Sequence, residues 1–343
     1  MPLVVDIGVF AHNEVAGIST MLAHLAAQDI WTADDISARV LVLANGCTDA
    51  TVATARDTAA AFGARLQPEV CDFPLGGKSR TWNRFVHDLA RADADVLIFC
   101  DADIEFCGSD ALQRLARGLR ARPPLWVLNS QPVKDIVARP QALSALDKII
   151  AAASGGLDDW KSAICGQLYA MPAHHARGLH LPIGLPVEDG FLRAMVLTDA
   201  LTQPEDFSRI DGLDGLCHIY VSERSVSALI RHQIRIVIGS AVNAACFAAI
   251  RNVTATQRRT ALATAAAQDD WLTNVIQQRL PRLPYGFVPV HFLTKRLARF
   301  ARTPRDLLRP RRVFVAVLGF GFDLIVYLRA QVAMWRGKGA GFW

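Results

Sequence analysis

The N-terminal part of the chain repeats one pattern, in which a short apolar run is followed by a polar turn and a helix-spaced segment. The runs at 3–10, 40–43 and 96–100 are rich in bulky apolar residues and too short for ordinary helices, so each predicts a buried strand. Apolar residues at helical spacing follow the first two turns, over 15–27 and 51–62. Strands that alternate with helices predict an α/β domain with a doubly wound, mainly parallel sheet flanked by helices.

The same pattern continues, with less regular spacing, to about residue 225. Gly166 stands near the entrance to one predicted strand, and Pro172 closes that strand. The pattern predicts further strands at 66–70, 126–130 and 165–171, and further helices at 79–91, 109–119, 143–153 and 191–197.

Beyond this point the pattern becomes helical. The run 236–250 is alanine-rich and almost uncharged, and 254–278 has helical spacing. We therefore predict two parts, an α/β domain over 1–225 and a helical C-terminal region over 226–343.

The last apolar run, 313–328, contains one charged residue, Asp323. A helix that spans a bilayer needs about twenty apolar residues. This run reaches that length only when it is extended to Trp335, which adds Arg329 and Gln331. Three interpretations stay open: a transmembrane helix, a helix in the membrane interface, and a helix packed on the α/β domain.

The excess of positive charge is confined to one segment. The chain has 37 Lys and Arg against 32 Asp and Glu, and the segment 279–312 holds ten of these basic residues with Asp306 as its acid. Such a cluster next to an apolar helix favours contact with an anionic membrane surface, although a solvated basic face also accounts for it. The segment has no recognisable nucleic-acid motif, so we expect no nucleic-acid partner.

The cysteines and the N-terminus bear on the compartment. The chain has 7 cysteines, and none of them forms a C-x-x-C pair. This favours reduced thiols in a cytoplasmic protein and argues against structural zinc. No basic leader precedes the first apolar run, so no secretory signal is expected. With the basic segment, we expect a cytoplasmic protein at the inner face of the cell membrane.

Two carboxylates directly follow the strand predicted at 96–100. Ligands of parallel sheets bind outside the carboxyl ends of the strands, so Asp101 and Asp103 can face a common pocket. Hard divalent cations such as Mg²⁺ and Mn²⁺ prefer carboxylate oxygen and leave coordination sites for substrate phosphates. The pattern predicts a metal and diphosphate site.

Two other short stretches carry candidate chemistry. Glu188 and Asp189 precede an apolar helix, where acids favour the positive end of the helix or can act as a general base. Lys78 follows two glycines, so it can approach a phosphate or simply lie in an exposed turn. The chain has no G-x-G-x-x-G after its first strand and no P-loop motif, which argues against a dinucleotide or P-loop site.

The order of these motifs resembles that of glycosyltransferase family 2, over roughly residues 3–240. The resemblance implies a GT-A fold and inverting transfer of a sugar from a nucleotide donor to an acceptor hydroxyl. The motifs are Asn13-Glu14, the run 45–51, Gly77-Lys78 with Asn83, Asp101-Ala102-Asp103 and Glu188-Asp189.

The resemblance also implies roles for particular residues. Asp103 would coordinate the metal that bridges the diphosphate of the donor, and Asp101 would hold the ribose or sugar or assist the metal. Asp189 falls on the catalytic base. The nucleotide pocket would be lined by Asn13, Glu14 and Asn45, with Lys78 nearby.

The chain departs from the family pattern in two places. Members often carry an aspartate pair after the second strand, whereas this chain has Ala44-Asn45, which leaves the nucleotide base open, with uridine as the first expectation. Processive members show Q-x-x-R-W, and the corresponding place here, 232–236, lacks the glutamine and the tryptophan. We therefore expect transfer of a single sugar. The further candidates for acceptor binding or closure of the site are Gly166, Glu188, His232 and Arg235.

The resemblance thus implies a metal-dependent hexosyltransferase, in cell-envelope glycan or glycolipid synthesis. The basic segment beside the apolar helix favours a lipid-linked or membrane-associated acceptor. A non-catalytic module that binds a nucleotide sugar with the same fold is the alternative. A sugar-phosphate nucleotidyltransferase would need a glycine-rich loop after Val9, which this chain lacks. The sugar and the acceptor are chosen by loops such as 106–110 and 155–167, so they are not predicted.

Overall fold

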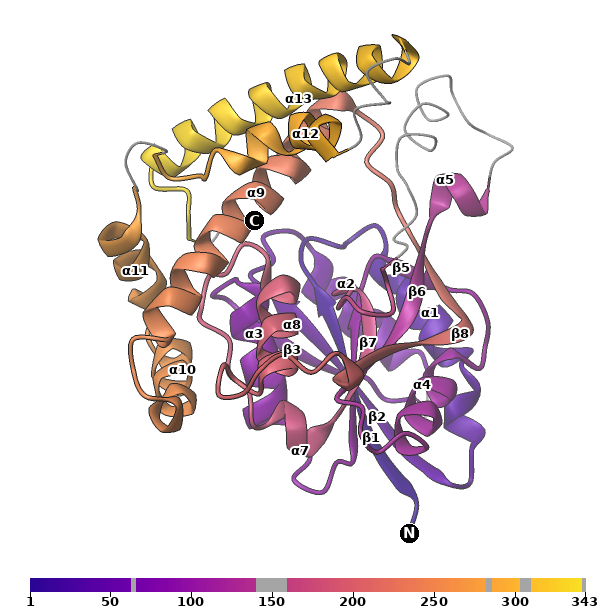
Figure 1. Ribbon diagram of the computed structural model, residues 1–343. Helices are drawn as coiled ribbons and strands as arrows, with labels where there is room; N and C mark the ends of the chain where they lie inside the picture. The colour runs from indigo at the N-terminus through magenta and orange to yellow at the C-terminus, as the bar shows by residue number, and fades with distance from the viewer. Residues whose placement is uncertain (63–65, 140–158, 282–285, 303–309, 341–343) are drawn as a thin grey trace.

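The computed structural model describes residues 1–62, 66–139, 159–281, 286–302 and 310–340 (Figure 1). The helix predicted at 143–153 lies outside these residues. The strands and helices given below belong to the described residues.

One sheet runs through the described residues, with strand order β3-β2-β1-β4-β7-β6-β8-β5. β1 (Leu3–Ala11) pairs in parallel with β2 (Ile36–Asn45) and with β4 (Val96–Asp101), and β3 (Glu69–Phe73) pairs in parallel with β2. This half of the sheet has the predicted doubly wound arrangement. Both of its faces are covered, which explains why its central strands are almost continuously apolar.

The other half of the sheet is mixed. β7 (Leu168–Pro172) is antiparallel to β4 and to β6 (Val127–Lys134). β8 (Ile210–Tyr220) is parallel to β6 and antiparallel to the short β5 (Ile104–Phe106). The sequence did not predict β5 or β8, because β5 is three residues long and β8 contains aspartates and glycines that strands usually avoid.

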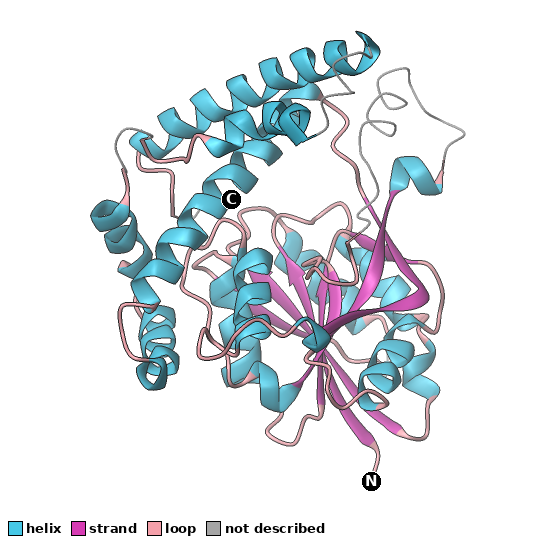
Figure 2. Ribbon diagram, in the orientation of Figure 1, coloured by secondary structure: helices cyan, strands magenta, loops and turns pink. Residues whose placement is uncertain are grey.

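The sheet separates two apolar cores, as side-chain alternation requires. Val96, Ile98 and Cys100 of β4 face one core, and Leu97 and Phe99 face the other. Helices cover both faces (Figure 2). They are α1 (Ile18–Ala26), α2 (Thr51–Ala60), α3 (Lys78–Arg84) with a π-helical turn η3 (Phe85–Leu89), α4 (Ala111–Arg120), α7 (Ala173–Ala176) and α8 (Glu188–Thr198), with 3₁₀ turns η1 (Asp29–Thr32) and η5 (Phe207–Arg209). The single-turn helix α5 (Asp135–Ala138) directly follows β6 and lies beyond the end of the sheet (Figure 1).

The C-terminal region is helical, as predicted. The long helix α9 (Val226–Ile250) packs against α8 of the α/β part and against α11 and α13. In Figure 1, α13 lies on the side of the molecule toward which the carboxyl ends of β1 and β2 point. The remaining helices are η6 (Ala255–Gln257), α10 (Arg258–Ala267), α11 (Trp271–Arg279), α12 (His291–Arg302) and α13 (Pro310–Trp335). The division at residue 225 into two domains stays a prediction.

Candidate active site

Lys78 lies at the centre of the candidate site, at the first position of α3. Its ammonium Nζ lies 2.6 Å from Oδ1 and 2.8 Å from Oδ2 of Asp101, the last residue of β4. It also donates to the carbonyl oxygen of Gly166 at 3.0 Å and lies 3.4 Å from Oε1 of Glu188. One lysine therefore joins the end of β4, the approach to β7 and the start of α8.

The acids around Lys78 have perturbed pKa values. Burial, opposed by the charge of Lys78 and reinforced by that of Asp103, raises the pKa of Asp101 to about 7. Burial lowers the pKa of Lys78, but the charges of Asp101 and Glu188 outweigh this effect and raise it above its ordinary value. Lys78 therefore stays protonated at neutral pH, while Asp101 titrates near neutrality.

Asp189 lies beside this group, in the first turn of α8. Burial and the charge of Glu188 raise the pKa of Asp189 to about 6, against the hydrogen bond from the amide of Gly190 and the charges of Lys78 and Arg235. Gly166, whose φ is +69°, approaches it so closely that a Cβ at this position would lie 3.3 Å from Cβ of Asp189. Gly166 thus lines the site next to Asp189.

Helix α9 fixes the segment that carries Glu188 and Asp189. Asn243 of α9 donates a hydrogen bond from Nδ2 to the carbonyl oxygen of Val187 at 3.0 Å. Arg235, two turns earlier on α9, lies near enough for its charge to lower the pKa of Asp189. The C-terminal region thus takes part in building the site.

His232 lies one turn before Arg235 and is partly buried. Burial lowers its pKa, and the charge of Arg235 adds to this effect. The two residues proposed from sequence to close the site therefore lie together, and the position of Arg235 connects them to Asp189.

Aromatic side chains line the site together with Lys78, and the sequence analysis did not predict them. The rings of Trp82 and Tyr169 are nearly parallel to that of Phe99, with ring centroids 5.6 and 4.6 Å from its own, and the indole of Trp82 donates to the hydroxyl of Tyr169 at 3.1 Å. Two spacings in the sequence could have indicated these aromatic residues. Phe99 lies two residues before Asp101 on a strand, and Trp82 lies four residues after Lys78 on a helix, so each shares a face with a candidate site residue. A small pocket is lined by Phe10, Lys78, Trp82, Phe99, Gly166, Tyr169, Glu188, Asp189 and Leu192.

The residues predicted to line the nucleotide pocket lie at the ends of β1 and β2. Asn13, at φ 55°, accepts a hydrogen bond from the amide of Thr48 at 2.8 Å. Asn45 is 3% exposed and accepts from the amide of Gly77 at 2.7 Å. Both side chains thus hold the turns around the site, and their contact with a nucleotide stays a prediction.

Glu14 connects this group to the aspartates after β4. Burial and the charges of Asp103 and Asp49 raise the pKa of Glu14 above its ordinary value. Its amide donates to Oγ1 of Thr51 at 2.7 Å, which ties the end of β1 to the start of α2. The carboxyl ends of β1, β2 and β4 thus meet at one edge of the sheet, as predicted.

Comparison with solved structures identifies the architecture. A mannosyltransferase from Pyrobaculum calidifontis, solved in complex with GDP-Man and Mn²⁺, superposes with a TM-score of 0.51 and 18% identity, over 94% of this chain and 86% of that chain. The chain has the GT-A fold. No protein-family model matches the sequence, and no curated protein matches it either.

Two other solved structures show weaker likenesses to this chain. Glucosyl-3-phosphoglycerate synthase from Mycobacterium tuberculosis, with Mn²⁺, UDP-glucose and phosphoglyceric acid, gives a TM-score of 0.45 at 18% identity over 70% of this chain and 79% of that chain. Residues 1–349 of S. aureus TarS give a TM-score of 0.46 at 14% identity, over 98% of this chain and 92% of that chain.

The residues of the GT-A site suit a divalent cation. Asp103 is exposed next to Asp101, and its charge raises the pKa of that carboxyl, so a cation would relieve a repulsion that exists here. Both oxygens of Asp101 contact Lys78, which leaves Asp103 as the better-placed ligand. Within the described residues no group of three or more His, Cys, Asp or Glu converges. The two carboxylates therefore fit an ion such as Mg²⁺, which takes further ligands from phosphates and water.

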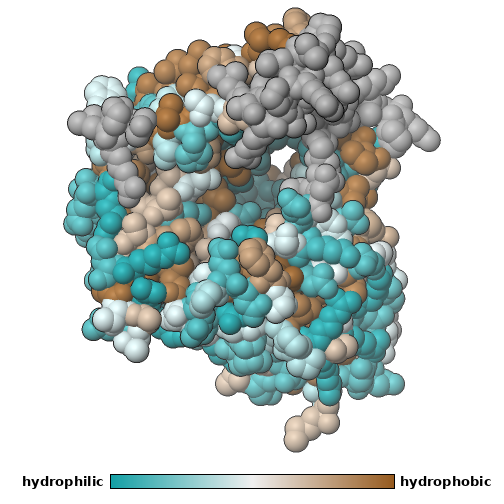
Figure 3. Space-filling view, in the orientation of Figure 1, coloured by the Kyte–Doolittle hydropathy of each residue, from teal (hydrophilic) through white to brown (hydrophobic). Residues whose placement is uncertain are grey.

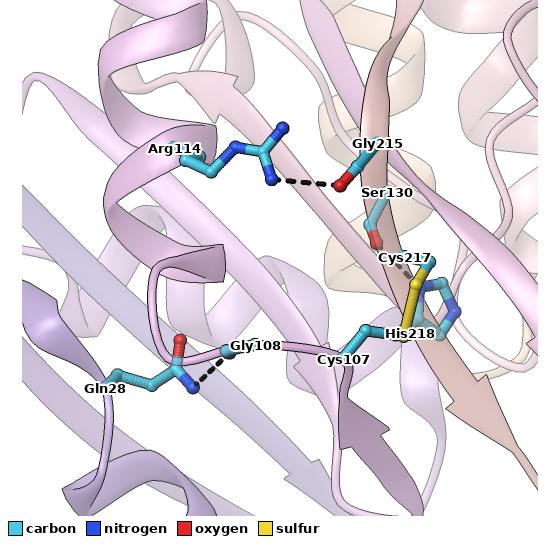
Figure 4. The surroundings of a disulfide bond; sticks show 8 residues. All are labelled: Gln28, Cys107, Gly108, Arg114, Ser130, Gly215, Cys217 and His218. Carbon is cyan, nitrogen blue, oxygen red and sulfur yellow. Dashed lines mark hydrogen bonds between the residues drawn. A yellow bond between two sulfur atoms is a disulfide. The ribbon is translucent and has the colours of Figure 1, made fainter.

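A disulfide lies next to this edge of the sheet, where the sequence led us to expect free thiols. Cys107 and Cys217 are joined, because Phe106 of β5 pairs with His218 of β8 and brings them to a Cα separation of 5.6 Å (Figure 4). Nδ1 of His218 lies 3.0 Å from Oγ of Ser130, and Nε2 of His218 lies 3.1 Å from Oε1 of Gln167. The two cysteines are 110 residues apart in the sequence, so no local spacing indicated that they pair. The other cysteines, at 47, 71, 100, 165 and 246, are free.

Proposed function

We propose that this protein is an inverting glycosyltransferase of the family 2 type, which moves a single sugar from a nucleoside-diphosphate donor to an acceptor hydroxyl. One observation carries the proposal: Lys78 lies between Asp101, which ends β4 two residues before Asp103, and Glu188, and it lines a small pocket together with Glu188 and Asp189. The GT-A fold, which the mannosyltransferase shares, supports this interpretation.

Asp101 and Asp103, together with Lys78, would hold the leaving group. A divalent cation at Asp103, assisted by Asp101, would supply positive charge to the donor diphosphate as the glycosidic bond breaks. Lys78 adds a fixed positive charge at the same edge, and its raised pKa keeps it protonated. The nucleotide would lie toward Asn13, Glu14 and Asn45.

Asp189 would act as the general base. A carboxylate whose pKa is about 6 is largely ionised at neutral pH and still accepts a proton effectively. It would take the proton of the acceptor hydroxyl while that oxygen attacks the anomeric carbon from the face opposite the diphosphate. Attack from that face inverts the configuration of the sugar. Gly166, Glu188, His232 and Arg235 would shape the acceptor side.

The donor and the cation follow from the same proposal. We propose Mg²⁺ or Mn²⁺ as the cation, in line with the Mn²⁺ in the mannosyltransferase complex. A UDP-sugar is the first candidate donor on the resemblance to family 2, and a GDP-sugar is the second because that mannosyltransferase binds GDP-Man.

We further propose that the acceptor is lipid-linked or membrane-associated, in cell-envelope glycan or glycolipid synthesis, and that segment 279–335 contacts the membrane from the cytoplasmic side. Two helices of the described chain are long and apolar enough to cross a membrane, over Val226–Ile250 and Val313–Trp335. The first is mostly buried in the protein, so the second is the one available for lipid.

The alternative is a non-catalytic module that binds a nucleotide sugar. Both functions predict that UDP or GDP raises the melting temperature in a manner that needs Mn²⁺, because a ligand stabilises the state that binds it. Only an enzyme releases the nucleoside diphosphate from the donor. Donor hydrolysis with Mn²⁺ therefore separates the two.

The experiment compares wild type with Asp103→Ala in thermal-shift assays of UDP and GDP, with and without Mn²⁺. We expect the Mn²⁺-dependent shift to be lost in this variant. Asp93→Ala is the matched control, because Asp93 is an exposed aspartate that precedes the amino end of β4. A shift that survives in Asp103→Ala would contradict the role of Asp103.

A further inference from the structure

Helix α13 exposes an apolar face to solvent. Large apolar side chains recur along it every three or four residues, and they include Phe314 at 64% exposed, Leu318 at 59%, Leu328 at 54% and Trp335 at 75%. Figure 3 shows hydrophobic side chains gathered along the same edge of the molecule. A contiguous apolar strip of this kind marks an interaction surface.

Two polar residues within the apolar part of α13, Asp323 and Gln331, face the protein. Asp323 is 7% exposed, and Gln331 accepts from the amide of Phe287 at 2.8 Å and donates to the carbonyl of Val288 at 2.9 Å. A surface helix of a soluble protein has the opposite arrangement, with its apolar side inward. The composition of α13 is therefore matched to an apolar environment outside the protein.

The packing of α13 argues against a helix that crosses the bilayer. Val326, Ala330 and Met334 are buried, and the helix packs against α9 and α12. α9 in turn packs against α8, which carries Asp189. A spanning α13 would have to leave α9 or draw the α/β part into the bilayer, whereas a helix lying flat in the interface keeps these contacts.

Cations accompany the apolar strip. A groove at the C-terminal end of α13 is lined by Leu328, Val332 and Ala333 together with Arg329, Arg336 and Lys338. No ion pair found in the described part of the chain includes any of these three cations. The neighbouring segment 291–312 adds eight Lys and Arg and one acid to the same end of the sequence. Such a pairing of apolar and cationic groups complements acyl chains beside lipid phosphates.

We propose that α13 lies flat in the interface of an anionic membrane, with its apolar strip among the acyl chains and Arg329, Arg336 and Lys338 on lipid phosphates. This deepens the membrane contact of the proposed function by assigning the helix, its orientation and a phosphate-binding groove. The carboxyl edge of the sheet lies on the same side of the molecule (Figure 1). A lipid-linked acceptor would therefore reach the site from the membrane.

The test is flotation of the full chain with vesicles of phosphatidylcholine, with and without phosphatidylglycerol. We expect wild type to float with the anionic vesicles and to be released by salt. The double variant Leu318→Glu and Leu328→Glu should stay unbound. Phe207→Glu is the matched control, because Phe207 is 57% exposed on the α/β part and should float like wild type.

A second variant tests the phosphate groove. Replacing Arg329, Arg336 and Lys338 by Gln should weaken binding to anionic vesicles by about a hundredfold and leave binding to phosphatidylcholine unchanged. All substituted side chains are exposed, so we expect melting temperatures close to that of wild type. Equal binding of this variant and wild type would refute the phosphate groove.

Three results would overturn the proposal. Wild type could fail to bind anionic vesicles, or resist extraction by alkaline carbonate as a spanning helix does. Alternatively, the glutamate variant could convert a dimer to a monomer in light scattering, which would show that a second copy covers the strip. Donor hydrolysis without vesicles is measured in parallel, so failure of membrane binding is distinguishable from failure of the proposed sugar transfer.

Discussion

Gly239 of α9 lies directly against Val187, the residue that precedes Glu188 and Asp189. A Cβ at position 239 would come within 2.3 Å of Cγ2 and 2.7 Å of Cβ of Val187, closer than atoms can approach. Together with the hydrogen bond from Asn243, this contact fixes the start of α8 relative to α9. The position of the proposed base therefore depends on a glycine about fifty residues later in the chain.

Gly239→Ala should reduce both stability and activity. We expect a loss of about 1–3 kcal/mol in the free energy of unfolding, which is typical of overpacking, and a lower kcat because Asp189 is displaced. Gly321→Ala is the control, since a Cβ there meets nothing within 4 Å, and alanine in a helix should stabilise by about 1 kcal/mol. Chemical denaturation of both variants measures the difference, and equal stability would contradict the proposed contact.

Removal of the proposed base should abolish transfer and preserve binding. Asp189→Asn should lower kcat by about 10²–10⁴-fold, while the Mn²⁺-dependent thermal shift with nucleoside diphosphate persists. A loss of both properties would indicate a structural role for Asp189.

The pH dependence of kcat/KM tests the same residue. Because the pKa of Asp189 is about 6 and its ionised form is the base, activity should fall tenfold per pH unit below about 6. Glu188→Gln should move this limb to lower pH, since the charge of Glu188 raises the pKa of Asp189. If Glu188→Gln does not shift the acidic limb of the kcat/KM profile, a group other than Asp189 titrates there.

Lys78 and Asp101 should be coupled in stability. Lys78→Met leaves Asp101 without its cation and should cost about 1–3 kcal/mol at neutral pH. The cost should shrink toward pH 5, because the pKa of Asp101, already about 7 with the lysine present, rises further without it and protonation removes the charge. The double variant with Asp101→Asn should lose less than the sum of the single variants, and strict additivity would show that the pair does not interact.

The disulfide should stabilise the fold. Cys217→Ser removes a cross-link between residues 110 positions apart and should cost about 2–4 kcal/mol. A reductant should lower the melting temperature of wild type and leave that of the variant unchanged. Cys71→Ser, which changes a free and partly buried thiol, should respond to reductant as wild type does. Wild type that is insensitive to reductant would contradict the bond.

The sequence alone determined the elements that depend on local periodicity. The strand that ends at Asp101, the turns at Asn13 and Asn45, and the apolar helix that follows Glu188 and Asp189 are each visible in a short window of residues. Parallel strands place their carboxyl ends at one edge, so it followed that Asp101 and Asp103 would meet the other turns there.

The tertiary structure decided everything that depends on which residues meet across long sequence separations. Strand β8 has a weak local pattern and forms because β5 and β6 pair with it. The join between Cys107 and Cys217, the contact between Gly239 and Val187, and the stack of Trp82, Phe99 and Tyr169 arise from packing that no sequence window contains.

Helix α13 shows the same limit most clearly. Its composition left three interpretations open, because sixteen mostly apolar residues suit a membrane or a core equally well. Only the burial of Asp323 and Ala330 against the exposure of Leu318 and Leu328 shows which face is turned outward. Local sequence specifies a helix through its backbone hydrogen bonds, but the direction of its apolar face is set by the elements that pack against it.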